Sequence, residues 1–160
     1  MKKRRIDIIN ILKYGMVAVI IAYVAVLLAR QGGDAPMKEV KKQVVEAMKT
    51  EGMESAGTQE LKRYYGLNAN DFESVVLYIP NDVMGVNELL IVRLKDESQA
   101  ETVVKAAQKR LDTQTESFEG YGAEQTKLLK AAMLDNRGMY VFMAIGKNAD
   151  KAYSAFKKSL

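Results

Sequence analysis

The sequence predicts an α+β protein in which an N-terminal transmembrane helix precedes one α-ββα-ββα domain. Two observations favour this class. A long apolar stretch lies near the N-terminus, and beyond it the apolar pattern changes twice from a pair of strands to a helix. The simplest layered arrangement is a four-stranded antiparallel sheet with its helices on one face. A chain of 160 residues has room for one such domain and an anchor.

Residues 11–29 form the expected transmembrane anchor. As a helix this stretch is about 28 Å long, close to the ~30 Å of a bilayer hydrocarbon core. Its one charged residue, Lys13, lies near an end, from which its ammonium group reaches the headgroups. Cleaved secretory signals end in small residues, whereas Leu27 and Leu28 here are bulky. We therefore expect an uncleaved anchor with the lipid bilayer as its partner.

Residues 1–10 form the expected cytoplasmic basic tail. Lys2, Lys3, Arg4 and Arg5 are consecutive, and moving them across the membrane opposes the membrane potential. The expected location is the cytoplasmic membrane, single-pass, with the N-terminus inside and the domain outside. Residues 1–30 contain six of the 24 Lys and Arg residues but only one of the 20 Asp and Glu residues. The net charge of the rest of the chain is therefore close to zero. We therefore expect no nucleic-acid partner.

Small residues recur along one face of the expected anchor at spacings of three and four. They are Gly15, Ala18, Ala22, Ala25 and Ala29. Such a face lets two membrane helices approach closely, which predicts a homo-oligomer. Alanine is also common in membrane spans, so the pattern has a second interpretation without any association.

The domain is expected to fill residues 37–160, after a linker at residues 30–36 that contains two glycines. A helix should cover residues 37–50, with Pro36 suited to its first turn. Its apolar positions follow helical spacing, at Met37, Val40, Val44, Ala47 and Met48. A short helical turn is expected at residues 58–63.

The first ββα unit begins with strands at residues 73–79 and 88–94, where apolar and β-branched residues dominate. Residues 80–85 between them have turn chemistry. A helix is expected over residues 97–115, and Asp96 with Gln99 forms a candidate capping box at its start.

The second ββα unit has expected strands at residues 130–135 and 139–145. The tripeptide Asn136-Arg137-Gly138 between them is typical of a tight hairpin. A final helix is expected over residues 149–158. Residues 117–129, which connect the two units, should form a loop with a short helix.

Composition excludes several classes of chemistry. The chain has no Cys and no His, so it has no disulfides, no thiol nucleophile, no Cys or His zinc ligand and no Ser-His-Asp triad. The glycines match no nucleotide-binding motif, and no serine lies in a nucleophile elbow. We therefore predict no catalytic residue, no metal and no cofactor. A Ser–Lys or carboxylate pair assembled by the fold stays open.

Two groups of side chains are candidates for a site. The carboxylates of Asp71, Glu73 and Glu88 are expected to be solvated strand ends, because their spacing does not bring them together. With the helix ending near Arg110, that residue and the aromatic pair Phe118 and Tyr121 predict a notch that binds a carboxylate or a peptide of a partner. In the alternative, the two rings fill the core and Arg110 caps carbonyls of its own helix.

Residues 87–160 resemble a family of small extracytoplasmic domains of Gram-positive, mostly clostridial, bacteria, a domain of unknown function. The resemblance rests first on an acidic residue that opens an apolar strand, Glu88, and on a long helix that ends near Arg110. A Ser-Phe-x-x-Tyr motif follows at Ser117, Phe118 and Tyr121. A Gly-x-Tyr-Val-Phe motif comes last, at Gly138, Tyr140, Val141 and Phe142. It implies a lipoprotein or single-span protein. This chain departs from the family at Gly122-Ala123, where Ala-Pro is usual, and it has no cysteine for lipidation.

These features predict a membrane-tethered binding or scaffold domain that presents one face to a protein or an envelope polymer. Two alternatives remain open. One is a cell-envelope hydrolase with a site assembled by the fold, for which a concave pocket with converging titratable groups is required. The other is a self-assembling membrane component that associates through the small-residue face.

Overall fold

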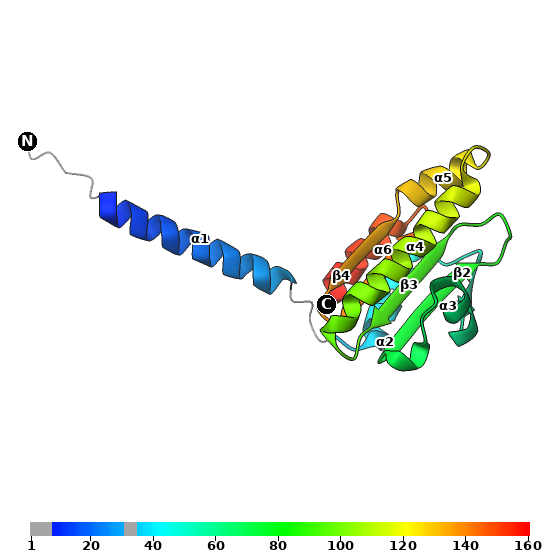
Figure 1. The fold of residues 1–160 in the computed structure, drawn as a ribbon, viewed down its shortest axis with the longest axis horizontal. Helices are drawn as coiled ribbons and strands as arrows, with labels where there is room; N and C mark the ends of the chain where they lie inside the picture. Colours follow the sequence, from blue (N-terminus) through cyan, green and yellow to red (C-terminus); the bar gives the residue numbers. More distant parts are fainter. Residues whose placement is uncertain (1–7, 31–34) are drawn as a thin grey trace, which may run out of the picture. The chain divides into compact units, whose positions relative to one another are not determined.

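The computed structural model describes residues 8–30 and 35–160, and for residues 8–11 and 26–30 it describes the backbone alone. The chain divides into two compact units, Met1–Gln31 and Gly32–Leu160. Each unit has its own architecture and is treated by itself (Figure 1). Residues 1–7 of the expected basic tail and residues 31–34 of the expected linker lie outside the described residues.

The first unit is the helix α1, Ile8–Arg30, which includes the whole of the expected anchor. Every side chain described in it, from residue 12 to residue 25, is exposed. The large apolar ones among them are Leu12, Tyr14, Met16, Val17, Val19, Ile20, Ile21, Tyr23 and Val24. Among the described residues, no helix has both the length and the apolar character of a membrane span.

The second unit is built on a five-stranded antiparallel sheet with the order β1-β2-β3-β5-β4. Its strands are β1 (Met53–Ala56), β2 (Ser74–Pro80), β3 (Glu88–Arg93), β4 (Met133–Arg137) and β5 (Tyr140–Ile145). The four expected strands are confirmed. The fifth, β1, was not expected, because its four residues Met-Glu-Ser-Ala have no run of β-branched or aromatic side chains.

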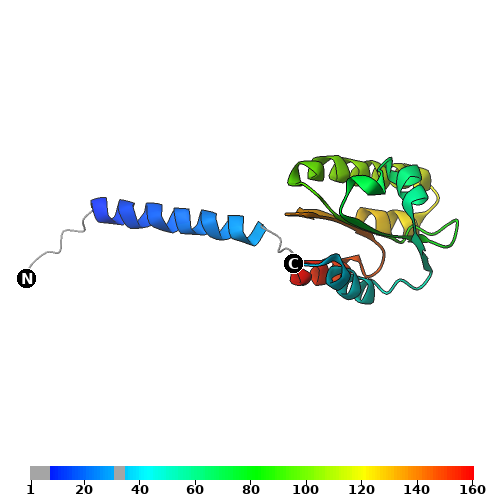
Figure 2. The same cartoon turned by 90° about the horizontal axis from the view of Figure 1, so that it is seen from below.

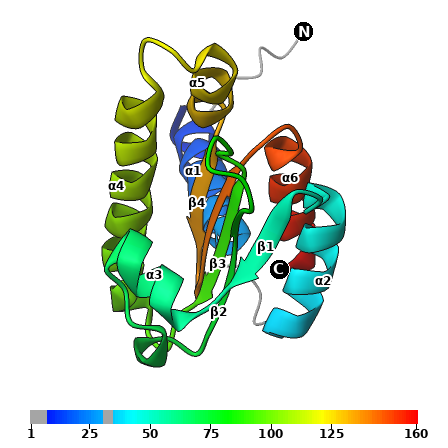
Figure 3. The ribbon, with the colours of Figure 1, turned by 90° about the vertical axis from the view of Figure 1, so that its right-hand side faces the viewer.

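Helices cover both faces of the sheet, as Figures 2 and 3 show. They are α2 (Met37–Met48), α3 (Thr58–Tyr65), α4 (Ala100–Phe118), α5 (Ala123–Lys130) and α6 (Ala149–Ser159). Helices α2 and α6 lie side by side on one face, and α3, α4 and α5 lie on the other. Short 3₁₀ turns at Ala69–Asp71 and Glu97–Gln99 precede β2 and α4.

The prediction that all helices lie on one face is therefore wrong. Alternate residues of a strand point to opposite faces, and in β3 both sets are buried. Leu89 and Ile91 belong to the core under α2 and α6, whereas Leu90 and Val92 belong to the core under α3 and α4. A strand that is apolar at consecutive positions needs a cover on each side.

The register of β3 also places the residue on which the candidate site depends. Glu88 begins the strand and pairs with Ile145 of β5. Because Glu88 is two residues before Leu90, its side chain lies on the same face as that leucine, under α3 and α4.

Candidate functional site

A cavity of about 530 Å³ opens between α3, the second half of α4 and the connection from β2 to β3. Arg63 and Tyr64 line it from α3, and Arg110, Gln114 and Phe118 line it from α4. Its wall also includes the acidic residues Glu54 and Asp82. Its volume lies within the ~300–1,000 Å³ that is usual for small-ligand sites.

A fully buried carboxylate, Glu88, lies behind this cavity with 0% of its surface exposed. A buried charge is stable only when it is paired and fully hydrogen-bonded. Arg110 supplies the pair: its Nη2 is 2.9 Å from Glu88 Oε2, and its Nε is 3.2 Å from Oε1. Gln114 Nε2 donates to Oε2 at 2.7 Å, and the Tyr65 hydroxyl donates to Oε1.

The helical periodicity of α4 places Arg110 and Gln114, which both donate to Glu88, on the inward side of the helix. Val103, Ala107, Arg110, Gln114 and Phe118 follow each other at steps of three or four, so they form one inward stripe. The helix ends at Phe118, beyond the predicted residue 115 and well beyond the end near Arg110 on which the predicted notch depends. Arg110 therefore lies within the helix and pairs with Glu88 instead of capping carbonyls. The prediction that Glu88 is a solvated strand end is also wrong.

The network changes the proton affinities of its members. Burial raises the pKa of the Tyr65 hydroxyl well above its usual value, and the adjacent Glu88 charge raises it further. Burial lowers the pKa of the Arg110 guanidinium, but the hydrogen bonds and the charge of Glu88 outweigh burial, so the net pKa is raised. Tyr65 therefore stays a donor and Arg110 stays a cation throughout the physiological range.

The predicted trio is only partly brought together. Arg110 and Phe118 both line the cavity, and Phe118 also contributes to the core with 8% of its surface exposed. Tyr121 is 69% exposed on the loop after α4, where its ring centroid is 5.8 Å from that of Phe118. The trio as a partner-binding site stays a prediction.

Sequence reasoning missed Tyr64, Arg63 and Gln114. Two cations lie near the Tyr64 ring: the guanidinium carbon of Arg110 is 4.4 Å from its centroid and that of Arg63 is 5.5 Å away. The signal for Gln114 was present, because it occupies a position where the apolar stripe of α4 should continue.

One exposed apolar side chain lines the same cavity, and two others lie next to its lining residues. Within residues 35–160 the large apolar residues with exposed surface are Val83, Met84 and Tyr121. Val83 is 96% exposed and lines the cavity, and Met84 follows it in the same connection. Gln125 Nε2 donates to the Met84 carbonyl at 3.3 Å, which ties this connection to α5.

Two polar side chains at the cavity are engaged in hydrogen bonds within the fold. The Glu88 oxygens accept hydrogen bonds from three side chains, Tyr65, Arg110 and Gln114. Ser117 lines the cavity, but its hydroxyl donates to the Thr113 carbonyl at 2.8 Å, and no lysine is among the described lining residues. The described residues contain no group of three acidic side chains that could hold a metal ion.

Asp71 and Glu73, the other two candidate carboxylates, are exposed as predicted. Glu73 forms an ion pair with Arg93 at 2.8 Å, and Asp71 ends a 3₁₀ turn. Neither lies with Glu88 in the network around Arg110.

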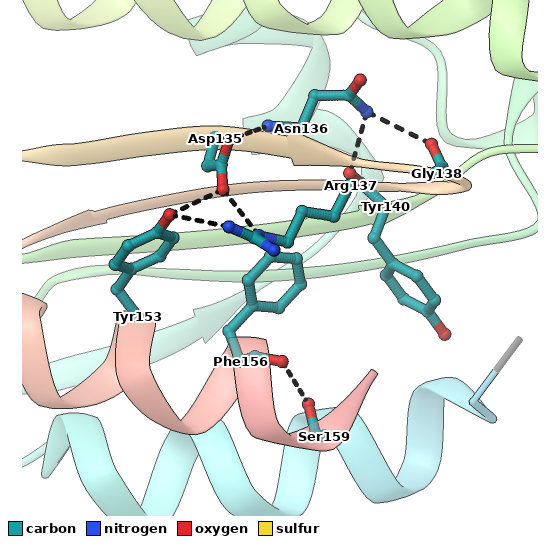
Figure 4. A network of polar contacts seen from close by, with 8 residues as sticks. All are labelled: Asp135, Asn136, Arg137, Gly138, Tyr140, Tyr153, Phe156 and Ser159. Carbon is teal, nitrogen blue, oxygen red and sulfur yellow. Dashed lines mark hydrogen bonds and ion pairs between the residues drawn. The ribbon is translucent and has the colours of Figure 1, made fainter. Parts of the chain in front are cut away.

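A second polar network joins β4 to α6 on the opposite face of the sheet (Figure 4). The Tyr153 hydroxyl donates to Asp135 Oδ2 at 2.7 Å, and Arg137 Nε donates to the same oxygen at 2.9 Å. Asn136 Nδ2 donates to the carbonyls of Gly138 and Tyr140, which closes the predicted hairpin. All of these contacts are internal to the fold, so we assign the network a structural role.

The small-residue face of α1 is present as a helical face. Gly15, Ala18, Ala22 and Ala25 are exposed, and the side chain of Ala29 lies outside the described residues. Association through this face stays a prediction.

Comparison with known proteins gives one match. A family model described as "Domain of unknown function (DUF4358)" matches residues 46–146. The matched range includes every strand of the sheet, α3, α4 and α5, and therefore the whole of the cavity. The comparison with curated proteins and the comparison with solved structures each found no match. Because the model covers more than half of the chain, the protein belongs to the family of DUF4358 domains.

Proposed function

We propose that this protein is a membrane-tethered extracytoplasmic binding domain whose cavity between α3, α4 and the β2–β3 connection receives a protein partner. The observation that carries the proposal is the coincidence of this cavity with the exposed apolar residues of the domain. Val83 lines the cavity, Met84 follows Val83 in the chain, and the Tyr121 ring lies 5.8 Å from that of the lining residue Phe118. The rest of the described domain has its large apolar side chains buried or half-buried.

Clustered apolar residues on a surface are typical of interfaces. An interface also needs polar groups that fix the orientation of the partner. Here Arg63, Asn81 and Thr113 are exposed on the cavity wall and offer both donors and acceptors. Arginine and aromatic residues such as Tyr64 and Phe118 are the side chains that most often dominate binding energy.

The tether is supported by α1. Its apolar side chains from Leu12 to Val24 are exposed, and apolar surface in water costs about 25 cal/mol per Å². Lipid removes this cost, and in the sequence the apolar stretch continues through Leu27 and Leu28. The consecutive cations at residues 2–5 favour retention of the N-terminus in the cytoplasm, so the domain is placed outside.

A photocrosslinking amino acid tests whether the cavity meets a partner in intact cells. We place it at Thr113, which is exposed on the cavity wall, and at Lys105, which is exposed on the same helix away from the cavity, as the matched control. The expected result is an adduct to one defined segment of a protein from Thr113 and no such adduct from Lys105. Equal crosslinking from both positions, or none from Thr113, would contradict the proposal.

A further inference from the structure

We infer that the ligand of the cavity is a peptide segment that ends in a carboxylate, with the carboxylate on Arg63 and Arg110 and an amide N–H on Gln114. This inference rests on the proposed function and specifies its chemistry. Three groups on the cavity wall carry it, and each has unused hydrogen-bonding capacity.

The first group is the Arg63 guanidinium. Arg63 is exposed on α3 and lines the cavity. Its guanidinium lies near the Tyr64 ring and attracts the Glu60 carboxylate one turn earlier in α3, but among the described residues no carboxylate forms a direct ion pair with it. A planar guanidinium that lies near an aromatic ring and is open to a cavity is suited to bind a carboxylate through two parallel hydrogen bonds.

The second group is the free end of Arg110. Its Nε and Nη2 are bound to Glu88, which leaves Nη1 without a partner among the described residues. The Glu88 carboxylate and the Tyr64 ring at 4.4 Å hold this guanidinium in place. Both arginines lie near the same Tyr64 ring and line the same cavity, so an anion bound there is within the field of two cations.

The third group is the amide oxygen of Gln114. Glu88 is a carboxylate that only accepts, so the Gln114 atom 2.7 Å from it must be the NH₂ group. The orientation of the amide is therefore fixed. Its Oε1 is buried and has no hydrogen-bond partner, and the residue is only 6% exposed on the cavity wall. Buried acceptors without a donor are rare in native proteins, and a ligand N–H would satisfy this one.

The acidic residues of the cavity argue against a simple inorganic anion. Glu54 and Asp82 also line it, so its wall carries both signs of charge. A ligand must then supply donors as well as a carboxylate, and a peptide carboxyl terminus with its preceding amide groups does so. The apolar parts of Ile79, Pro80 and Phe118 leave space for its side chains.

The test uses two pools of N-acetylated tripeptides without Asp or Glu, one with a free C-terminal carboxylate and one with a C-terminal amide. The full chain in lipid nanodiscs is incubated with each pool, and the retained peptides are counted by mass spectrometry. We expect about tenfold better retention of the free acids, the effect of one charge-assisted hydrogen bond. Arg63→Gln should remove this preference, and Lys62→Gln, an exposed neighbour outside the cavity, should keep it.

Gln114→Met should reduce retention of both pools, because it removes the acceptor for the ligand amide. Equal retention of the two pools, or an unchanged preference in Arg63→Gln, would overturn the carboxylate inference and leave cavity binding intact. Retention of neither pool would overturn the peptide inference as well. The proposed function has a separate test, the crosslinking from Thr113, and only the result of that experiment would overturn it.

Discussion

At the scale of residues, the fold depends on one buried charge. Glu88 is fully buried, and Arg110 is the cation that balances it, with 16% of its side chain exposed. Breaking a buried pair leaves an uncompensated charge, whereas removing both partners leaves none.

We predict that Glu88→Gln and Arg110→Met each lower the free energy of unfolding by about 3–5 kcal/mol. The double variant should lose less than the sum of the two single losses by about 1–3 kcal/mol, because it removes both charges. Urea unfolding of the four proteins in mild detergent measures this cycle. Additive losses would show that the two side chains do not stabilise each other.

Tyr65→Phe removes one donor to Glu88 and keeps the packing of the ring. We expect a loss of about 1.5–3 kcal/mol, the range for a hydrogen bond to a charged group. Tyr153→Phe is the matched control, since its hydroxyl donates to Asp135 at a half-buried position. In urea unfolding, Tyr153→Phe should lose less free energy of unfolding than Tyr65→Phe. Equal losses would show that burial does not strengthen the hydrogen bond from Tyr65 to Glu88.

The raised pKa of Tyr65 gives the same residue a pH dependence. The unfolded tyrosine loses its proton near its usual value of 10.0, while the folded one keeps it. The folded state then binds more protons, so stability that is complete below pH 10 falls as the pH rises toward the folded pKa. Between about pH 10 and pH 11.5 the wild type should lose more stability than Tyr65→Phe, and parallel curves would contradict this prediction.

The sequence predicted Arg110 as a site residue but not its partner. The interpretation of Glu88 as a strand end ignored that residue 88 shares its face with Leu90 and Val92, both of which are fully buried. The spacing along α4 contained a second signal, because Arg110 and Gln114 continue the helical spacing of the buried Val103 and Ala107. The contact between the two could not be predicted, because it depends on which helix covers which face of β3.

At the scale of elements, most boundaries followed from local chemistry. The capping box at Asp96 and Gln99 is confirmed: Asp96 Oδ1 accepts from the Ser98 N–H at 2.8 Å, and Gln99 Oε1 accepts from the Asp96 N–H at 3.3 Å. Local signals of this kind do not depend on the rest of the fold. The edge strand β1 and the two-sided cover of the sheet do depend on it, which is why they were missed.

The cap also predicts an acid effect. Hydrogen bonds from Ser98 lower the pKa of Asp96 below its usual 3.8. A lowered folded pKa means that its stabilisation is complete above pH 3.8 and is lost as the pH falls through the lower folded value. Asp96→Asn keeps an oxygen cap without the charge, so its melting temperature should be below that of the wild type at pH 7, and the difference should shrink as the pH falls below 3.8.

Glu116→Gln is the control for this comparison. It removes an exposed carboxylate near the carboxyl end of α4, where a negative charge is unfavourable. Its melting temperature at pH 7 should be equal to or above that of the wild type. A decrease in Glu116→Gln as large as that in Asp96→Asn would show a general charge effect and not a cap.

At the scale of the whole molecule, an apolar helix precedes a domain whose exposed large apolar residues lie at or next to one cavity. The basic residues near the N-terminus favour a domain outside the membrane. The exposed Val83, Met84 and Tyr121 favour a partner there. Both claims predict which side chains a reagent outside the cell can reach. One set of labelling experiments therefore tests both.

Because the chain has no cysteine, a single introduced cysteine is a unique label site. Thr113→Cys places it on the cavity wall, and Lys105→Cys places it on the outer side of the same helix. A membrane-impermeant maleimide should label both variants on intact cells. Thr113→Cys should react more slowly than Lys105→Cys in cells, and at a similar rate in the purified protein, because the partner covers the cavity. Labelling of either site only after lysis, or an equal ratio in cells and in the purified protein, would contradict the account.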